Sequence, residues 1–62
     1  MRKFDVLLEH KKRRLLYKDL EGKKAIKLMQ ELERRKYKTV AFTQSIGFVE
    51  TLTLEQMQES VL

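Results

Sequence analysis

The hydrophobic pattern of this chain changes its period twice within residues 3–52. Apolar and polar side chains alternate over residues 3–9, recur at helical spacing over about 21–36, and alternate again over 38–44 and 48–52. Alternation is typical of a half-buried strand, and the longer period is typical of an amphipathic helix. The pattern therefore predicts an α+β domain with strands on both sides of a central helix.

The first two strands are expected to form a β-hairpin. Residues 3–9 alternate, and a second strand is expected from Arg13 to Asp19. The polar break between them lacks the Asn-Gly or Asp-Gly pair that favours a tight turn. The alternative is one long helix from about Leu7 to Lys36, which would have to include Gly22 at a cost of about 1 kcal/mol.

The main helix, from about Glu21 to Lys36, has its apolar residues on one face and Lys and Glu on the other. Asp19 is the candidate N-cap, and Glu31 and Arg35 are spaced as a favourable i,i+4 ion pair. This amphipathic helix is expected to pack on an antiparallel sheet. Its apolar positions are Ala25, Ile26, Leu28, Met29 and Leu32.

The second half predicts another hairpin and a short C-terminal helix. Ser45-Ile46-Gly47 reads as the hairpin loop, with Gly47 able to adopt the positive φ that such loops need. Thr53 and Gln56 have the spacing of a capping box, and Leu52 and Met57 that of a hydrophobic staple. The expected element order is β-β-α-β-β-α in a single compact domain spanning residues 1–62.

The chain has no cysteine and only one histidine, His10. Disulfides, thiolate zinc sites and cysteine nucleophiles are thereby excluded, and His10 lacks the partners of a catalytic triad or a metal site. We therefore expect no enzyme activity, no catalytic residue, no metal and no cofactor. A core of this size rarely supplies more than about 3–5 kcal/mol, so self-association as a homodimer is expected to help stabilise the fold.

No apolar run approaches the length of a membrane span, and the N-terminal apolar stretch is too short and too charged for a signal-peptide core. We therefore expect no membrane partner. The absence of cysteine fits a reducing compartment, and the cytoplasm is the expected location.

Positive charge is confined to the first part of the chain. All 14 Lys and Arg residues lie within residues 2–38, where six acids accompany them and leave +8. The remaining 24 residues carry three Glu and no cation, which gives −3 and the overall charge of +5. This asymmetry predicts one basic face and one mildly acidic region.

Two basic groups are the candidate binding residues. The first lies at the expected hairpin tip, where consecutive cations repel each other unless an anion lies among them. The second follows Gly22 at the start of the main helix, where free backbone N–H groups and lysines suit a phosphate. Both groups also fit a solvated surface, and charges on a hairpin discourage pairing with other strands. The candidate residues are Lys11, Lys12, Arg13, Arg14, Lys18, Lys23 and Lys24.

Ile46 to Glu50, followed by the helix start at Thr53, resembles the third strand and second helix of an RNA-recognition motif. The resemblance covers residues 25–62 and implies that Phe48 occupies an RNA-stacking position. The family's basic-Gly-aromatic-Gly-aromatic run is reduced here to one Gly-Phe pair, and no strand follows the last helix. We therefore expect Phe48 to be a core residue and assign no family from the sequence.

The predicted function is a non-enzymatic binding module that contacts nucleic-acid phosphates through its basic N-terminal half. Weak sequence preference is expected, because the chain has no Asn and few Gln to read base edges. The alternative is a small regulatory protein-interaction module, as a homodimer, that binds an acidic protein partner or pairs through an edge strand.

Overall fold

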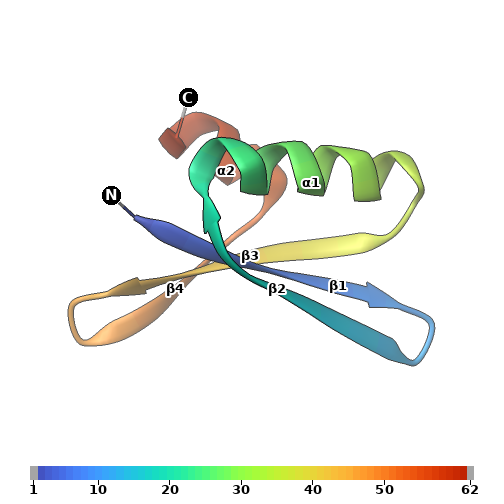
Figure 1. The fold of residues 1–62 in the computed structure, drawn as a ribbon, viewed down its shortest axis with the longest axis horizontal. Coiled ribbons are helices and arrows are strands. Elements are labelled where there is room, and N and C mark those ends of the chain that lie inside the picture. Colours follow the sequence, from blue (N-terminus) through green and yellow to red (C-terminus); the bar gives the residue numbers. More distant parts are fainter. Residues whose placement is uncertain (1, 62) are drawn as a thin grey trace.

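The computed structural model describes residues 2–61, which form a four-stranded sheet and two helices (Figure 1). The elements follow the predicted order β-β-α-β-β-α. Their bounds are β1 Lys3–His10, β2 Arg13–Glu21, α1 Gly22–Arg34, β3 Lys38–Ser45, β4 Phe48–Leu52 and α2 Leu54–Val61.

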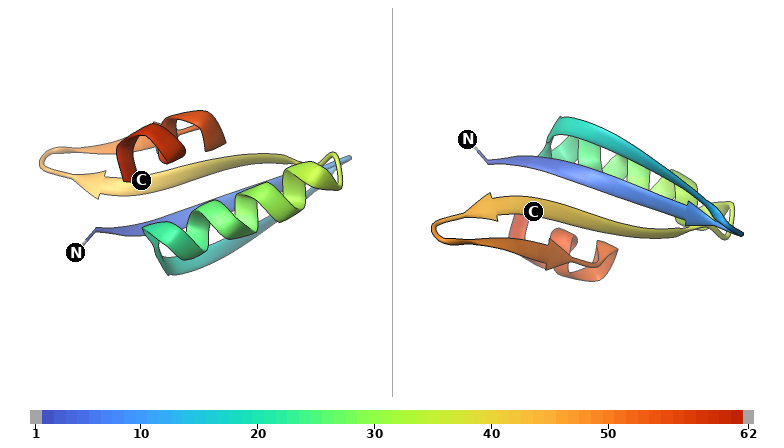
Figure 2. Two further views of the ribbon diagram at one scale, coloured as in Figure 1. Left: turned by 90° about the horizontal axis from the view of Figure 1, so that it is seen from above. Right: turned by 90° about the horizontal axis from the view of Figure 1, so that it is seen from below.

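The sheet is antiparallel throughout, with the strand order β2-β1-β3-β4. The long strands β1 and β3 lie at the centre, while β2 and the five-residue β4 form the edges. Both helices lie on the same side of the sheet (Figure 1), α1 over the β2–β1 half and α2 over the β3–β4 half (Figure 2). One face of the sheet therefore carries the core, and the opposite face is left without a covering element from residues 2–61.

The core lies between the two helices and the central strands. Val6 on β1 is directly opposite Ala41 on β3, and both are fully buried. Met29 of α1 and Met57 of α2 belong to the same cluster and are also fully buried. Both methionines are therefore core residues. The remaining members are Phe4, Ala25, Ile26 and Leu52.

Several local predictions are confirmed. The strands Arg13 onward and Lys38 onward form hairpins, so the alternative of one long helix from Leu7 is wrong. Gly47 has a φ of 82° in its two-residue turn. The Thr53 N–H donates to Gln56 Oε1, and the Gln56 N–H donates to Thr53 Oγ1, at 3.0 and 3.2 Å, which completes the capping box.

The predicted N-cap of α1 is wrong. Asp19 lies in β2, which continues to Glu21, and Glu21 is the N-cap residue without a side-chain capping bond. The pairing of β1 and β2 shifts by one residue between Phe4 and Val6, where Asp19 adopts a φ of 58°. The Asp19 N–H donates to Asp5 Oδ1 at 3.0 Å, so the acid next to this bulge, Asp5, satisfies the backbone there. Because Asp19 belongs to the bulge within β2, the strand continues past it to Glu21 and Asp19 does not cap α1.

The fold consists of two successive ββα units. Strands β1 and β3 have eight residues each and are 35 positions apart, as residues 3–10 and 38–45. Their two-residue turns, Lys11-Lys12 and Ile46-Gly47, have the same offset. Since Val6 and Ala41 share this offset and are paired, an approximate two-fold axis passes between them. The two hairpin tips therefore lie at opposite ends of the molecule (Figure 2).

Neither helix in residues 2–61 combines the length and the apolar character needed to cross a membrane.

Candidate functional site

One end of the molecule gathers cations from two distant parts of the chain. The β1–β2 tip and the C-terminal end of α1 lie at the same end (Figure 1), and we call this surface the basic end. It has eight exposed cations and three carboxylates, Glu9, Glu31 and Glu33, a local balance of +5. Its cations are Lys11, Lys12, Arg13, Arg14, Arg34, Arg35, Lys36 and Lys38.

The cations from Arg34 to Lys38 are positioned by the backbone conformation at the C-terminal end of α1. Lys36 has a φ of 67°, its N–H donates to the Glu33 carbonyl at 2.9 Å, and the Tyr37 N–H donates to the Leu32 carbonyl at 3.0 Å. This is the Schellman arrangement, with a lysine at the position that glycine usually occupies. It reverses the chain so that β3 begins at Lys38, which pairs with Glu9 of β1.

An aromatic contact joins the two segments of the basic end. The rings of His10 and Tyr37 have centroids 4.5 Å apart and are tilted by 57°. Beside them lies a hollow of about 160 Å³, walled by Leu8, Leu15 and the stems of two arginines. Leu15 is 53% exposed. Cations therefore surround a small apolar surface that includes two rings. The arginines are Arg13 and Arg14.

Ion pairs neutralise only some of the cations at the basic end. Arg14 lies 3.5 Å from Glu9, and Arg34 and Arg35 lie 3.2 and 3.6 Å from Glu31, the latter as predicted. All three pairs are exposed, so each contributes little to stability. The other five cations make no ion pair within residues 2–61 and are free to contact an anion; these are Lys11, Lys12, Arg13, Lys36 and Lys38.

The structure divides the predicted binding residues. Lys11 to Arg14 lie together at the basic end, whereas Lys23 and Lys24 lie at the start of α1, the end of this helix that is away from the basic end (Figure 1). The 13 residues of α1 separate the two groups by about 20 Å. Lys18 is exposed on β2 beside the bulge at Asp19. The sequence prediction missed the contribution of Arg34 to Lys38, because only the fold brings the end of α1 to the hairpin tip.

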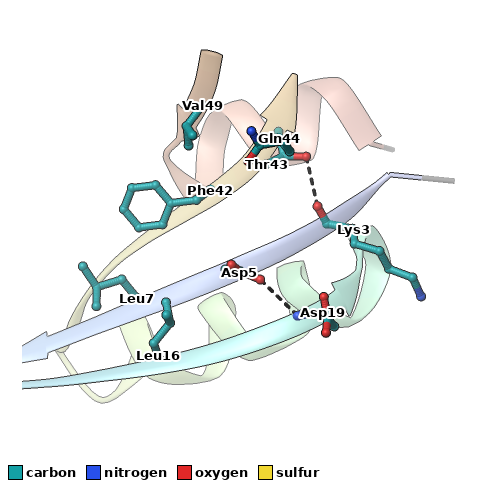
Figure 3. Close-up of a pocket in the computed structure, with 9 residues that line it drawn as sticks. All are labelled: Lys3, Asp5, Leu7, Leu16, Asp19, Phe42, Thr43, Gln44 and Val49. Carbon is teal, nitrogen blue, oxygen red and sulfur yellow. Dashed lines mark hydrogen bonds between the residues drawn. The ribbon is translucent and has the colours of Figure 1, made fainter. Parts of the chain in front are cut away.

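The open face of the sheet is a second surface (Figure 3). Residues directly opposite one another share a face, and the pairs Leu7–Leu16, Leu7–Val40 and Gln44–Val49 all lie away from the helices. Phe42, opposite Asp5, belongs to the same face. The apolar residues on it form what we call the open-face cluster: Leu7, Leu16, Val40, Phe42 and Val49.

Four residues of this cluster border a shallow hollow of about 570 Å³. In Figure 3 Leu7, Leu16, Phe42 and Val49 all project from the sheet on the side away from the helices. Leu16 and Val49 are 45% and 54% exposed. The hollow also includes the Asp5–Asp19 contact at the bulge.

Phe48 does not lie in the core, contrary to the prediction. It is 58% exposed at the start of the edge strand β4, opposite Ser45. It follows Gly47 at the neutral hairpin tip, at the end of the molecule opposite the basic end (Figure 2).

Within residues 2–61 no three His, Asp or Glu side chains come together as a group that could hold a metal ion. His10 contacts Tyr37, and Glu9 pairs with Arg14.

No family model, curated protein or solved structure matches this chain.

Proposed function

We propose that the chain is a non-enzymatic module that binds a nucleic-acid strand at its basic end, chiefly through phosphates. The observation that carries this proposal is the convergence of five unpaired cations from the β1–β2 tip and the end of α1 on one surface. Phosphates neutralise such a group by Coulomb attraction and by release of counterions. The cations of this surface are Lys11, Lys12, Arg13, Lys36 and Lys38.

Comparison with the β3–β4 tip supports a functional role for the cations of the β1–β2 tip. The two ββα units build equivalent two-residue turns, yet the second has Ile46-Gly47 where the first has Lys11-Lys12. Phe48 and Val49 likewise stand where the first unit has Arg13 and Arg14, given the offset of 35 residues. A hairpin tip of this fold therefore needs no cations to form. If the cations served only to discourage pairing with strands of other molecules, both tips would need them equally.

The His10–Tyr37 pair favours an unpaired strand over a duplex. Bases stack on exposed rings with little sequence preference, whereas paired bases in a duplex are not free to do so. The hollow beside the rings has apolar walls and cations at its rim. A strand would place a base near Tyr37 and its flanking phosphates on the cations.

The test is fluorescence anisotropy of labelled single-stranded RNA, single-stranded DNA and duplex DNA over a salt series. The double variant Lys12→Glu, Arg13→Glu should lower the affinity for single strands more than 10-fold, while circular dichroism confirms an unchanged fold. Unchanged affinity in this variant, or no binding of the wild-type chain to any probe at about 50 mM salt, would refute the proposal.

The same cations would also suit an acidic protein partner. Nucleic acid is favoured because the rings of His10 and Tyr37 lie among the cations. We place this function in the cytoplasm, in keeping with a cysteine-free sequence.

A further inference from the structure

We infer that the open face of the sheet is a dimer interface, and that its occupant is a second copy of this chain. The inference goes beyond the proposed function and does not depend on it, because the open-face cluster consists of apolar residues; Lys38, one of the five unpaired cations, borders the open face but is not part of the cluster.

The face has the composition of an interface core with a polar border. Five apolar side chains form its centre, and two of them, Leu16 and Val49, remain about half exposed. No element of residues 2–61 covers them. Contiguous exposed apolar surface on a small protein marks an interaction site, since isolated exposed residues are common but grouped ones are not.

The area is sufficient for a specific dimer. The four strands contain 8, 9, 8 and 5 residues. With about 3.4 Å per residue and about 4.8 Å between strands, the face has a footprint of about 500 Å². Two such faces bury about 1,000 Å² in total, which is the lower bound for a specific protein–protein interface. A second copy matches this footprint by construction, because the same face meets itself in a two-fold dimer.

The charges decide how the two copies are oriented. Arg14 and Lys38 border the open face at the basic end, on either side of Glu9. At the other end of the open face, Asp5 and Asp19 lie beside Lys3, so this end is not basic. If the β1 strands of the two copies ran in the same direction, the two basic ends would lie together, which is unfavourable at short range. The β1 strands of the two copies therefore run in opposite directions, and the basic ends lie at opposite ends of the dimer.

A second copy also provides the stabilisation that this small domain lacks. The core cluster consists of eight buried residues, and chains of this length often add an oligomeric contact to a thin core. Packing two open faces would create a second apolar layer on the other side of the same sheet. The sheet would then be buried on both faces at its centre.

Two adjacent leucines on β2 provide a matched test. Leu16 lies on the open face opposite Leu7, whereas Leu15 lies on the helix side opposite Leu8. They are 45% and 53% exposed, so the same substitution perturbs the monomer to a similar extent. We would measure the mass by sedimentation equilibrium for the wild type, Leu16→Glu, Val49→Glu and the control Leu15→Glu.

The wild-type chain should reach twice the monomer mass of 7.5 kDa. Leu16→Glu and Val49→Glu should each weaken the dimer by at least about 10-fold, because each places a charge in an apolar interface. Leu15→Glu should remain dimeric. A wild-type chain that is monomeric at about 100 μM would refute the inference and leave the face to another protein. A dimer equally sensitive to Leu15→Glu would refute it in favour of edge-strand pairing.

Nucleic-acid binding separates this inference from the proposed function. With a short oligonucleotide that spans one basic end, Leu16→Glu should retain the affinity of the wild type. Leu15→Glu should lose affinity, because it adds a carboxylate beside Tyr37 and Arg13. The opposite pattern would contradict the proposed function, whereas the dimer inference is decided by the mass measurements, so either one can fail while the other survives.

Discussion

The salt dependence of binding should fall when cations are removed from the basic end and should not fall when they are removed elsewhere. The variant is Lys12→Gln, Arg13→Gln, and the matched control is Lys23→Gln, Lys24→Gln at the start of α1. Both variants remove two exposed charges, and the control residues lie at the start of α1, away from the basic end. Net charge therefore changes equally, and only the location differs.

The magnitude follows from the number of unpaired cations. If all five contact phosphates of a single strand, the slope of log K against log salt is about −3.5, at about −0.7 per contact. Raising salt from about 50 to 200 mM then weakens binding about 100-fold. The Lys12, Arg13 variant keeps three contacts, so its slope should be about −2 and its loss about 20-fold. The control should keep the wild-type slope.

Fluorescence anisotropy at four or more salt concentrations measures these slopes directly. Equal reductions in both double variants would show that the protein acts through its overall charge, and the basic end would then have no special role. A wild-type slope near −1 would mean that the five cations do not contact phosphates together, which would contradict binding at the basic end.

The remaining predictions concern single side chains. Tyr37→Leu should weaken single-strand binding by about 1–3 kcal/mol and duplex binding much less, if one base stacks there; titration of both probes distinguishes the two outcomes. Lys36→Gly should stabilise the fold by about 1 kcal/mol, because glycine adopts the positive φ without strain; a lower urea midpoint would contradict this. Met29→Ala should cost about 2–5 kcal/mol, which is comparable to the whole stability of so small a domain, and heteronuclear NMR should show loss of the folded spectrum. Thr53→Ala should cost about 1 kcal/mol in urea denaturation through loss of the cap on α2, and no loss would mean that the capping box contributes nothing.

The elements of the fold could be predicted because their signals are local. Alternation specified β1 and β3, helical spacing specified α1, and the Thr53–Gln56 box specified the start of α2. The start of α1 was misplaced because Asp19 is a good cap in isolation. In the folded chain Asp19 lies in a bulge instead, and its backbone N–H donates to Asp5, which is 14 positions away in the sequence.

The candidate site could be predicted only in part. The tip residues Lys11 to Arg14 are consecutive, so their clustering is independent of the fold. Tyr37 and Lys38 join them because β3 pairs with β1 and places Lys38 opposite Glu9. The separation of Lys23 and Lys24 from the tip likewise follows from the direction of α1, which begins away from the basic end and runs toward it (Figure 1).

Which face of the sheet is buried was also decided by the tertiary structure. On β3 the larger residues Val40 and Phe42 face outward, while Ala41 and Thr43 face the helices. Alternation shows that two faces exist but not which one meets the core. Phe4 and Val6 of β1 direct their side chains to α1, and pairing with β1 then turns Ala41 inward. The element types, their order and the charge of each tip follow from neighbouring residues and are therefore visible in the sequence. Which cations meet and which apolar face remains open depend on pairing between residues far apart in the chain, and these features emerge only in the folded protein.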